Sequence, residues 1–518
     1  MQALQRKAAQ VIFPRLGSNM PPPVRVSEDF ERFKALHEVY QFGGLVLFNG
    51  HKTDTPATLT ALQEISEIPL LVASDIERGA GQQIEGTTRF PHAMACCKAG
   101  PDAVATFGRI TAQEALASGI HIAFTPVADV NSNPQNPIIG IRAFSDQVSE
   151  TKESVQTFIQ ACREVGLLAT AKHFPGHGDT ATDSHKEVPV VERSLKALAS
   201  VEFAPFTAAI DAGADLIMTA HVSYPALDTH GAVATLSPAI LTDLLKQQLG
   251  FQGAVISDSL IMQAIQPADG EMTQFAANLL NAGLDILLDP IDPVAMVHGV
   301  AEAVQKGLVP ESRLDEAIQK VQQLRDKITG RFGPAIFKNP AQTQQAGVVG
   351  SIKHKKDAQE IAQKAIRVHK GSPLFFADNN APDKQLAIFV TPYRTRLDPK
   401  ETPVGQALKL KYPDLPYTEV DAHTSSAELE DLVGMAKQRA AVLIIVVSKP
   451  AAWHNYGLPD ELHHFVTRLT EATSTTLVSL GDPHILDKYP SSTNTICTYS
   501  DVPVSQEALV EALSTASG

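Results

Sequence analysis

Short apolar runs alternate with longer helical patterns over the first two thirds of the chain. Each run is continuously apolar, as expected for strands that are buried on both faces of a sheet. The segments between the runs have the apolar spacing of amphipathic helices. The expected strands are 11–14, 45–48, 69–74, 122–126, 167–172, 215–220, 254–258 and 285–288, and the helices between them include 101–118, 148–165, 195–212 and 274–281. Eight βα repeats over roughly 300 residues predict a (β/α)8 TIM barrel.

The composition changes after an expected helix at 311–328. Residues 332–350 are rich in glycine, proline and glutamine, and this composition is typical of a linker. A second α/β set follows, with strands 386–391, 441–448, 476–480 and 495–499 and helices 356–368, 427–439 and 460–472. The pattern predicts a TIM-barrel domain over 1–331, a linker over 332–350 and a smaller three-layer α/β/α sandwich domain over 351–518. The second domain has no Gly-rich phosphate loop, so we expect no nucleotide cofactor.

Composition and charge narrow the range of partners. The 518 residues have a formal net charge of −14, which argues against nucleic acid and an anionic membrane surface, because both require basic patches. The four cysteines, Cys96, Cys97, Cys162 and Cys497, are too few for a disulfide scaffold and are expected to be buried thiols. No apolar run reaches the ~18 residues of a membrane span. We therefore expect a cytoplasmic protein; a chain from which a signal peptide had been removed would have the same pattern.

One stretch concentrates the candidate chemistry. Residues 172–185 read Lys-His-Phe-Pro-Gly-His-Gly-Asp, then, after Thr-Ala-Thr, Asp-Ser-His, and they follow the fifth expected strand. In an extended loop, residues two apart project to the same side, so Asp183 can hydrogen-bond His185. Such a pair fixes the histidine tautomer and raises its basicity, which suits proton transfer near neutral pH. The alternative for an isolated Asp-x-His is a solvated polar loop, but its position at a barrel rim favours the catalytic interpretation.

A metal site is an alternative interpretation of the same stretch. Its histidines and aspartates are common metal ligands. His173 and His177 have the four-residue spacing of a helical zinc pair, but Pro175 and Gly176 would break that helix. The chain also lacks an H-x-H at its first strand, which barrel metallohydrolases of the amidohydrolase type usually have. A metal-dependent barrel hydrolase therefore stays the less favoured alternative, and no metal is expected.

Other polar residues stand where the barrel would gather them. Asp75 follows the third expected strand, Lys172 and His173 the fifth, His221 the sixth and Asp258 the seventh. Function in such barrels lies at the carboxyl ends of the strands. Each carboxylate alone could be a structural ion pair at the rim. Together with Arg142, the set is typical of a site for a polyhydroxylated ligand, which needs many directional hydrogen bonds.

These motifs resemble those of the β-N-acetylhexosaminidases of glycoside hydrolase family 3. The Lys-His-Phe-Pro-Gly-His-Gly and Asp-Ser-His motifs are accompanied in order by resembling segments at 73–91, 140–145, 218–225 and 257–265, so the resemblance covers most of 1–335. It implies that Asp258 is the nucleophile and that His185, oriented by Asp183, is the acid/base. It implies sugar-binding roles for Asp75, Arg142, Lys172, His173 and His221. Where many relatives read Asp-x-Glu-Gly-Gly-Arg, this chain has Asp75-Ile76-Glu77-Arg78-Gly79, so no role is carried to Arg78.

The resemblance implies a retaining exo-β-N-acetylglucosaminidase that acts by double displacement. A retaining glycosidase normally uses two carboxylates ~5–5.5 Å apart; here one partner would be an imidazole, whose ordinary pKa near ~6.5 suits both acid and base steps. Because an imidazole does not repel anions, phosphate could replace water, so a phosphorylase stays an alternative, as does a β-glucosidase. A non-catalytic sugar-binding protein has no need of the paired catalytic groups. The substrate is expected to be an N-acetylglucosamine-containing oligosaccharide, muropeptide or glycoside, and the oligomeric state is left open.

Overall fold

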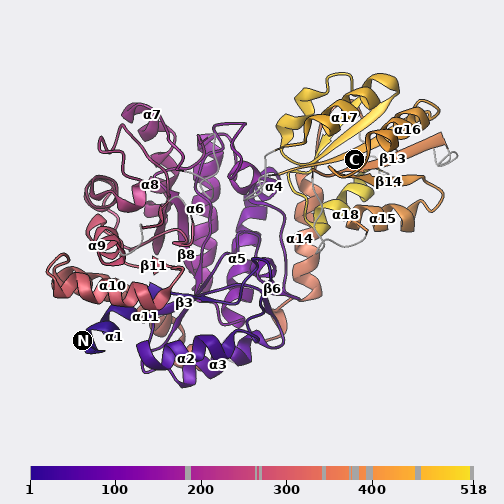
Figure 1. Ribbon diagram of the computed structural model, residues 1–518. Coiled ribbons are helices and arrows are strands. Elements are labelled where there is room, and N and C mark those ends of the chain that lie inside the picture. Colours follow the sequence, from indigo (N-terminus) through magenta and orange to yellow (C-terminus); the bar gives the residue numbers. More distant parts are fainter. Residues whose placement is uncertain are drawn as a thin grey trace. The chain divides into compact units, whose positions relative to one another are not determined.

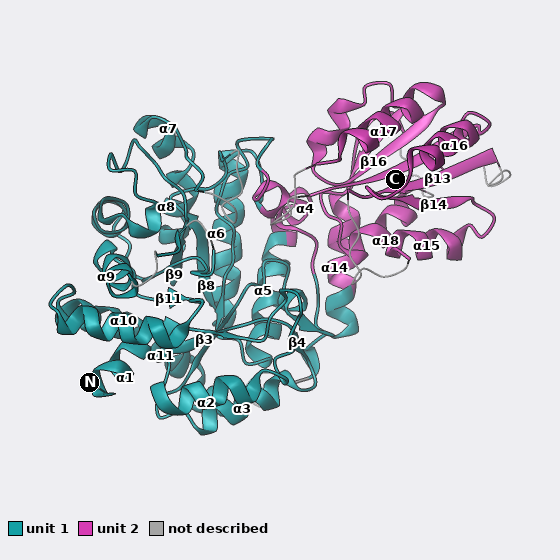
Figure 2. Ribbon diagram, viewed as in Figure 1, with its two compact units in different colours: residues 1–89, 104–136, 143–355 teal, residues 90–103, 137–142, 356–518 magenta. Residues whose placement is uncertain are grey.

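The computed structural model describes residues 2–180, 188–262, 265–267, 271–340, 346–372, 375, 384–392, 401–449 and 457–513. The chain forms two compact units, which Figure 2 shows in different colours. Unit 1 comprises Met1–Arg89, Val104–Asn136 and Ala143–Lys355, and unit 2 comprises Phe90–Ala103, Pro137–Arg142 and Lys356–Gly518. Two short segments of the amino-terminal part of the chain thus belong to the second unit.

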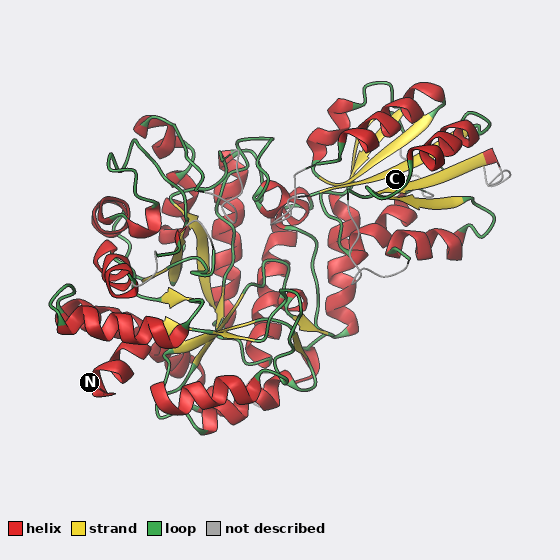
Figure 3. Cartoon of the chain, in the orientation of Figure 1, coloured by secondary structure: helices red, strands yellow, loops and turns green. Residues whose placement is uncertain are grey.

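Unit 1 is a parallel barrel (Figures 1 and 3). A parallel ladder runs in the order β10-β9-β8-β7-β5-β3-β2, and β1 pairs with β11. The ring closes because a parallel bridge joins Ile256 to Ile286 at the start of β11, and because only Pro14 separates β1 from β2. The strands are β1 Ile12–Phe13, β2 Arg15–Leu16, β3 Gly44–Leu47, β5 Leu71–Ser74, β7 Ile122–Ala123, β8 Leu168–Phe174, β9 Leu216–Thr219, β10 Ala254–Ile256 and β11 Leu287–Leu288. The predicted TIM barrel is confirmed, with strands that are mostly shorter than expected.

The strands are continuously apolar because they have no solvent face. Residues of β3, β5 and β10 are buried along their whole length, with the barrel interior on one side and helices on the other. A separate short pair joins β4 Gly50–His51 to β6 Ile84–Glu85 outside this ladder. The C-terminal strand ends therefore meet at one rim, where the barrel fold collects functional side chains.

The helices of unit 1 cover the outside of this ladder (Figure 3). They are α1 Gln2–Ala9, α2 Phe30–Tyr40, α3 Thr55–Glu64, α5 Pro101–Ala117, α6 Val148–Val165, α7 Leu195–Ser200, α8 Phe203–Asp211, the π-helical Ala239–Gln248, α9 Met272–Ala282, α10 Pro293–Gln305, α11 Glu311–Phe332 and α12 Ala335–Lys338, with α5 beginning in unit 2. Among the described residues, none of the helices combines the length and the apolar character needed to cross a membrane.

One expected helix is interrupted. The pattern of 195–212 predicts a single helix, but the structure has α7 and α8 with a break at Val201 and Glu202. Pro205 explains the break, because a proline has no N–H and its ring clashes with the carbonyl four residues earlier, here that of Val201. The break leaves Glu202 at the N-cap of α8, a position that the continuous helix would not have provided.

Unit 2 is a three-layer sandwich, as predicted (Figure 1). Its sheet has the order β12-β17-β16-β15-β13-β14, and the only antiparallel pair among these strands is β12 with β17. The strands are β12 Arg367–Lys370, β13 Gln385–Val390, β14 Tyr417–Val420, β15 Ala441–Ser448, β16 Thr475–Gly481 and β17 Asn494–Cys497. The helices are α4 Ala93–Lys98, α14 Ile352–Ala365 (which begins in unit 1), α15 Pro403–Lys411, α16 Ser426–Ala436, α17 Asp460–Ala472 and α18 Pro503–Ala512.

Each face of this sheet has its own core. On one face, alternate residues of β13 and β15 pack with apolar residues of α16 and α17. On the other face, the intervening residues pack with α15 and α18. The first core also contains Met94, Ala95 and Ile141, which lie in the two segments from the amino-terminal part of the chain. Those segments are therefore structural parts of the sandwich.

The edge strands β12 and β14 were missed in the sequence. All four residues of β12 are exposed, and β14 is fully buried only at Val420. A strand recognised by a buried apolar run cannot be found where the run is absent, and edge strands often lack it.

Candidate active site

Lys172 joins two acidic residues at the rim of the barrel. It lies near the end of β8, and its Nζ is 2.7 Å from Asp75 Oδ1 and 2.7 Å from Glu77 Oε1. The Lys172 side chain is only 3% exposed, whereas that of Asp75 is 34% exposed. A buried ammonium requires such partners, because an unpaired buried charge is very costly. The pairing fixes Asp75 at the carboxyl end of β5 with one side open to solvent.

Asp129 holds the histidine that follows Lys172. The fully buried carboxylate accepts hydrogen bonds from His173 Nδ1–H at 2.7 Å, from the His173 N–H at 3.2 Å and from the His177 N–H at 2.7 Å. Burial acts to raise the pKa of Asp129, but the neighbouring histidines outweigh it, and the net pKa lies below the usual value. Asp129 thus places the proton on Nδ1 and fixes the orientation of the His173 ring.

Asp258 stands at the carboxyl end of β10, partly exposed. Its Oδ1 accepts the N–H of Ser259 at 2.7 Å. Burial acts to raise the pKa of Asp258, but the charges of His173, His221 and Lys172 and the Ser259 N–H outweigh it and lower the pKa below its usual value. Asp258 is therefore a carboxylate that stays ionised in a largely enclosed position.

The residue after Asp258 is fixed by contacts from the neighbouring strands of the ring. Ser259 Oγ donates to Asp289 Oδ2 at 2.7 Å, and Asp289 pairs with Arg15 through both carboxylate oxygens, at 2.7 and 2.5 Å. Arg15 begins β2 and Asp289 follows β11. This chain of contacts joins three neighbouring strands and holds the backbone beside Asp258.

His221, the second residue past the end of β9, completes the group. Its Nδ1 lies 2.7 Å from Thr235 Oγ1, and its Nε2 lies 3.2 Å from the carbonyl oxygen of Ser259. Since a carbonyl only accepts, this contact favours a proton on Nε2. The His221 residue is only 1% exposed. Its imidazole therefore helps to position the loop that carries Asp258 and presents almost no surface to solvent.

The structure brings together five of the eight residues singled out in the sequence: Asp75, Lys172, His173, His221 and Asp258. Arg142 ends a 3-10 turn at Gly140–Arg142, donates to the carbonyl of Ile138 at 3.0 Å and belongs to unit 2. Asp183 and His185 lie outside the described residues. The catalytic and sugar-binding roles given to all eight remain predictions.

Four residues of this region were missed in the sequence: Arg15, Glu77, Asp129 and Asp289. The rule that polar residues gather after barrel strands would have found three of them. Arg15 directly follows the first expected strand, Asp289 directly follows the eighth, and Asp129 comes three residues after the fourth. Glu77 was part of the motif that carried Asp75.

Among the residues that the structure describes, no group of three or more His, Cys, Asp or Glu side chains is arranged to hold a metal ion. His173 and His177 both contact Asp129, and their ring centroids are 5.9 Å apart. The His173 ring is thus explained by its hydrogen bond to Asp129, and the His177 ring by its hydrogen bond with Thr180 Oγ1.

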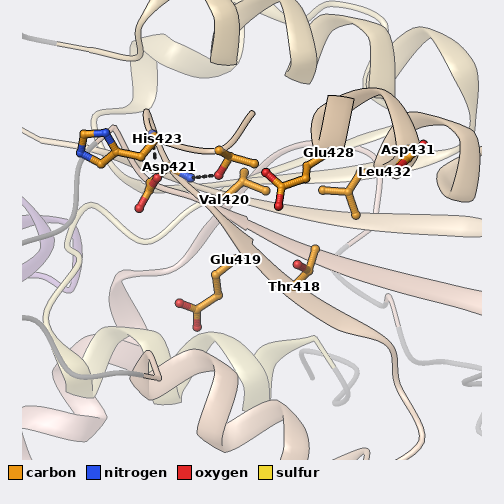
Figure 4. A pocket seen from close by; sticks show the side chains of 9 residues that line it. Thr418, Glu419, Val420, Asp421, His423, Glu428, Asp431 and Leu432 are labelled. Carbon is orange, nitrogen blue, oxygen red and sulfur yellow. Dashed lines mark hydrogen bonds between the residues drawn. The ribbon is translucent and has the colours of Figure 1, made fainter. Parts of the chain in front are cut away.

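A pocket of about 460 Å³ lies in unit 2 beside β14 and α16 (Figure 4). Its polar side chains serve local structure. Asp421 accepts the N–H of His423 at 2.8 Å, its own N–H donates to Thr424 Oγ1 at 3.0 Å, and Glu428 completes the capping box of α16. The acidic lining with its engaged groups contrasts with the barrel rim, where His173, His221 and Lys172 lower the pKa of Asp258.

The sequence of the chain matches the model of a known protein family. The model of the glycosyl hydrolase family 3 N terminal domain matches residues 4–324, and the chain therefore belongs to glycoside hydrolase family 3. It is 31% identical over 391 residues to the beta-hexosaminidase A of Pseudoalteromonas piscicida, an alignment that covers 67% of this chain and 63% of that protein. It is 30% identical to the beta-N-acetylglucosaminidase/beta-glucosidase of Cellulomonas fimi, over 64% of this chain and 60% of that protein. The chain thus spans somewhat less than two thirds of these two relatives.

Solved structures show the same architecture. A glycoside hydrolase family 3 beta-N-acetylglucosaminidase from Paenibacillus sp. str. FPU-7 superposes with a TM-score of 0.85 and 26% identity, covering 98% of this chain and 96% of that chain. The beta-glucoside phosphorylase BglX has a TM-score of 0.82 at 21% identity, covering 99% and 92%. At that identity the second match shows the fold alone. Both units of this chain therefore follow the two-domain architecture seen in the family.

Proposed function

We propose that the protein is a retaining exo-β-N-acetylglucosaminidase that acts by double displacement. Asp258 attacks the anomeric carbon and forms a glycosyl-enzyme, and His185, oriented by Asp183, protonates the leaving group and then activates water. The names of the hexosaminidase relatives support N-acetylglucosamine as the sugar. The motif at 172–185 supports Asp183 and His185 as the acid/base pair. No cofactor takes part.

The observation that carries the proposal is the environment of Asp258. A nucleophilic carboxylate must be ionised when substrate displaces water from the site. The charges of Lys172, His173 and His221 keep the pKa of Asp258 low in spite of burial. Lys172 also lies 2.7 Å from Asp75, whose partly exposed carboxylate can accept hydrogen bonds from sugar hydroxyls.

The test has two parts. The enzyme is given a chromogenic N-acetylglucosaminide, and the first product is followed by NMR; the proposal predicts the β-anomer before mutarotation. Asp258→Ala should reduce turnover by at least about 10⁴-fold, because the covalent step is lost. An initial α-anomer, or substantial turnover by Asp258→Ala, would contradict the mechanism.

The same assay separates the alternatives for acceptor and sugar. Rates are compared for the N-acetylglucosaminide and the glucoside, each with and without inorganic phosphate, and with a chelator. The proposal predicts preference for the N-acetyl sugar, free sugar as product and no effect of the chelator. Accumulation of sugar 1-phosphate would instead identify a phosphorylase.

A further inference from the structure

The polypeptide that leads into the segment with Asp183 and His185 is tied to a neighbouring loop. Thr180 is fully buried, and its Oγ1 lies 2.9 Å from His177 Nδ1. Asn136 Nδ2 donates to the His177 carbonyl at 2.9 Å and to Thr180 Oγ1 at 3.2 Å. These contacts fix Thr180, three residues before Asp183.

The polypeptide that leaves the segment is tied to a different loop. The Val191 N–H donates to the Ser223 carbonyl at 3.0 Å, and the Ser223 N–H donates to the Pro189 carbonyl at 2.9 Å. These parallel bridge contacts hold residues 189–191 beside the loop after β9. Both ends of the segment are thus attached to the barrel by backbone hydrogen bonds or buried side chains.

Arg193 connects the two ends directly. Its Nε and NH2 donate to the two oxygens of Asp179, at 2.5 and 2.7 Å, and NH2 also donates to Ser132 Oγ at 3.2 Å. A planar guanidinium that binds both oxygens of a carboxylate fixes distance and orientation together, which a lysine cannot do. Since Asp179 precedes the segment and Arg193 follows it, this pair sets the separation of its ends.

A third residue holds Arg193 from the inside. Arg193 NH1 lies 3.3 Å from Glu202 Oε1, and the Glu202 side chain is 2% exposed. Within the described parts of the chain, the Glu202 carboxylate oxygens have no hydrogen-bond partner, so this ion pair is their compensation. Glu202 also packs against the glycine turn of the motif, where a Cβ on Gly176 would come within 2.6 Å of the Glu202 Cβ. The proline-induced break between α7 and α8 thus brings a buried carboxylate to the base of the segment.

We infer that Arg193 is a positioning residue for proton transfer: by bridging Asp179 and Glu202, it fixes the described residues on either side of 181–187, the stretch that carries Asp183 and His185. The inference rests on the proposed role of His185 as the acid. Arg193 itself does not touch the reacting atoms. Its loss should therefore impair the step that needs a well-placed proton donor and spare the step that does not.

The experiment compares leaving groups. The kcat/KM of Arg193→Ala is measured on a dinitrophenyl N-acetylglucosaminide, whose leaving group needs no proton, and on an alkyl N-acetylglucosaminide, whose leaving group does. We expect a loss at least about 10-fold larger on the alkyl substrate. Arg193→Lys should show a smaller selective loss, since it restores the charge but not the two-point contact. Asp179→Asn, which keeps the side-chain size, should show the same selectivity and covers the case in which Arg193→Ala does not fold.

Two reference variants make the result decisive. Arg313→Ala removes an arginine that bonds Asp285 and two carbonyls away from the rim, so it should lower the melting temperature and affect both substrates equally. Equal losses on both substrates for Arg193→Ala and Asp179→Asn would overturn the inference. His185→Ala should show the strongest selectivity. If it shows none, the acid assignment and the inference fall together; if only the Arg193 and Asp179 variants show none, the positioning role alone falls.

Discussion

At the scale of single residues, the site depends on charges held away from water. Lys172 contacts Asp75 and Glu77, and together with His173 and His221 it contributes to the field that lowers the pKa of Asp258. An opposite charge nearby favours the ionised carboxylate more strongly where the surroundings exclude water. Lys172 thereby fixes the positions of Asp75 and Glu77 and helps to lower the pKa of Asp258.

This field predicts the acid limb of the pH–activity profile. In Lys172→Met, the pKa of Asp258 should rise, so the pH at which kcat/KM falls on the acid side should move upward by about 1 unit, with a lower maximum. Lys327→Met is the control, because Lys327 pairs with Asp215 at the start of β9, at the other end of the barrel. A profile of Lys172→Met with an unmoved acid limb would contradict this account.

Glu202 predicts a pH dependence of stability. Burial raises its pKa from 4.5 to about 7, although Arg193 partly offsets the effect. Between these values the folded protein binds the proton more tightly than the unfolded chain, so stability falls as pH rises, by on the order of 3 kcal/mol in total. Glu202→Gln removes the titrating carboxyl group and with it this pH-dependent loss of stability. Its stability relative to the parent, from urea unfolding, should therefore be greater at pH 8 than at pH 4.

The exposed Glu64 supplies the control, because Glu64→Gln removes a carboxylate that is in contact with water in both states. Its effect should be the same at both pH values. A relative stability of Glu202→Gln that is unchanged or lower at pH 8 would show that the carboxylate is not protonated near neutrality in the folded protein.

At the scale of elements, the turn after β8 is defined by its two glycines. A Cβ on Gly178 would lie 1.6 Å from the carbonyl oxygen of Val130, and Gly176 has a φ of +137°, which disfavours other residues. Tyr224 OH donates to the Gly176 carbonyl at 2.6 Å from the loop after β9. The glycines allow the turn to pass close to two neighbouring loops, which then hold the following residues.

Gly178→Ala should therefore be damaging. The backbone must move away from Val130, which should cost about 2–4 kcal/mol and displace the chain before Asp183. Gly330→Ala is the matched control, because nothing lies within 4 Å of its Cβ position in helix α11, and alanine should stabilise by about 0.5–1 kcal/mol. Thermal unfolding and kcat/KM measure both effects. A Gly178→Ala variant with parental stability and activity would contradict the close approach.

Sequence patterns located most elements because the core strands have uninterrupted apolar runs. Helix α6 and helix α17 were predicted with the observed bounds. The elements that were predicted wrongly have physical causes. Strand β12 has no buried residue, so it lacks the apolar run by which strands were recognised. The break between α7 and α8 depends on Pro205, and the apolar periodicity of 195–212 does not show it. The rim residues were found because residue type and position relative to an expected strand can both be read from the sequence. The partners of Asp129 and Arg15, His173 and Asp289, became visible only in the folded chain, because each pair lies far apart in the sequence.

At the scale of the whole molecule, the two compact units are interleaved along the chain. Unit 2 includes 90–103 and 137–142, and these segments contribute Met94, Ala95 and Ile141 to its core. The candidate sugar-binding residue Arg142 lies on the second of them. The second unit therefore fixes the conformation of a segment that carries a predicted site residue, although it has no such motif in its own 356–518 part.

This arrangement predicts the outcome of a truncation. A chain that ends at Lys355 leaves these apolar side chains without their core, so it should aggregate or unfold at a lower temperature than the full chain. Adding Met94→Gln and Ile141→Thr should recover part of its solubility. A truncated chain that is as soluble and as thermally stable as the full protein would contradict the prediction; light scattering and calorimetry supply the measurements.

The interleaving also limits how this protein can be recombined with its relatives. A chimera that takes only 356–518 from another member of the family pairs a foreign sheet with native residues at Met94, Ala95 and Ile141, whose shapes were matched to the original partner. The exchangeable module has three pieces, 90–103, 137–142 and 356–518. Any library of hybrids should therefore cross over at five points instead of one, and Arg142 would travel with the sandwich.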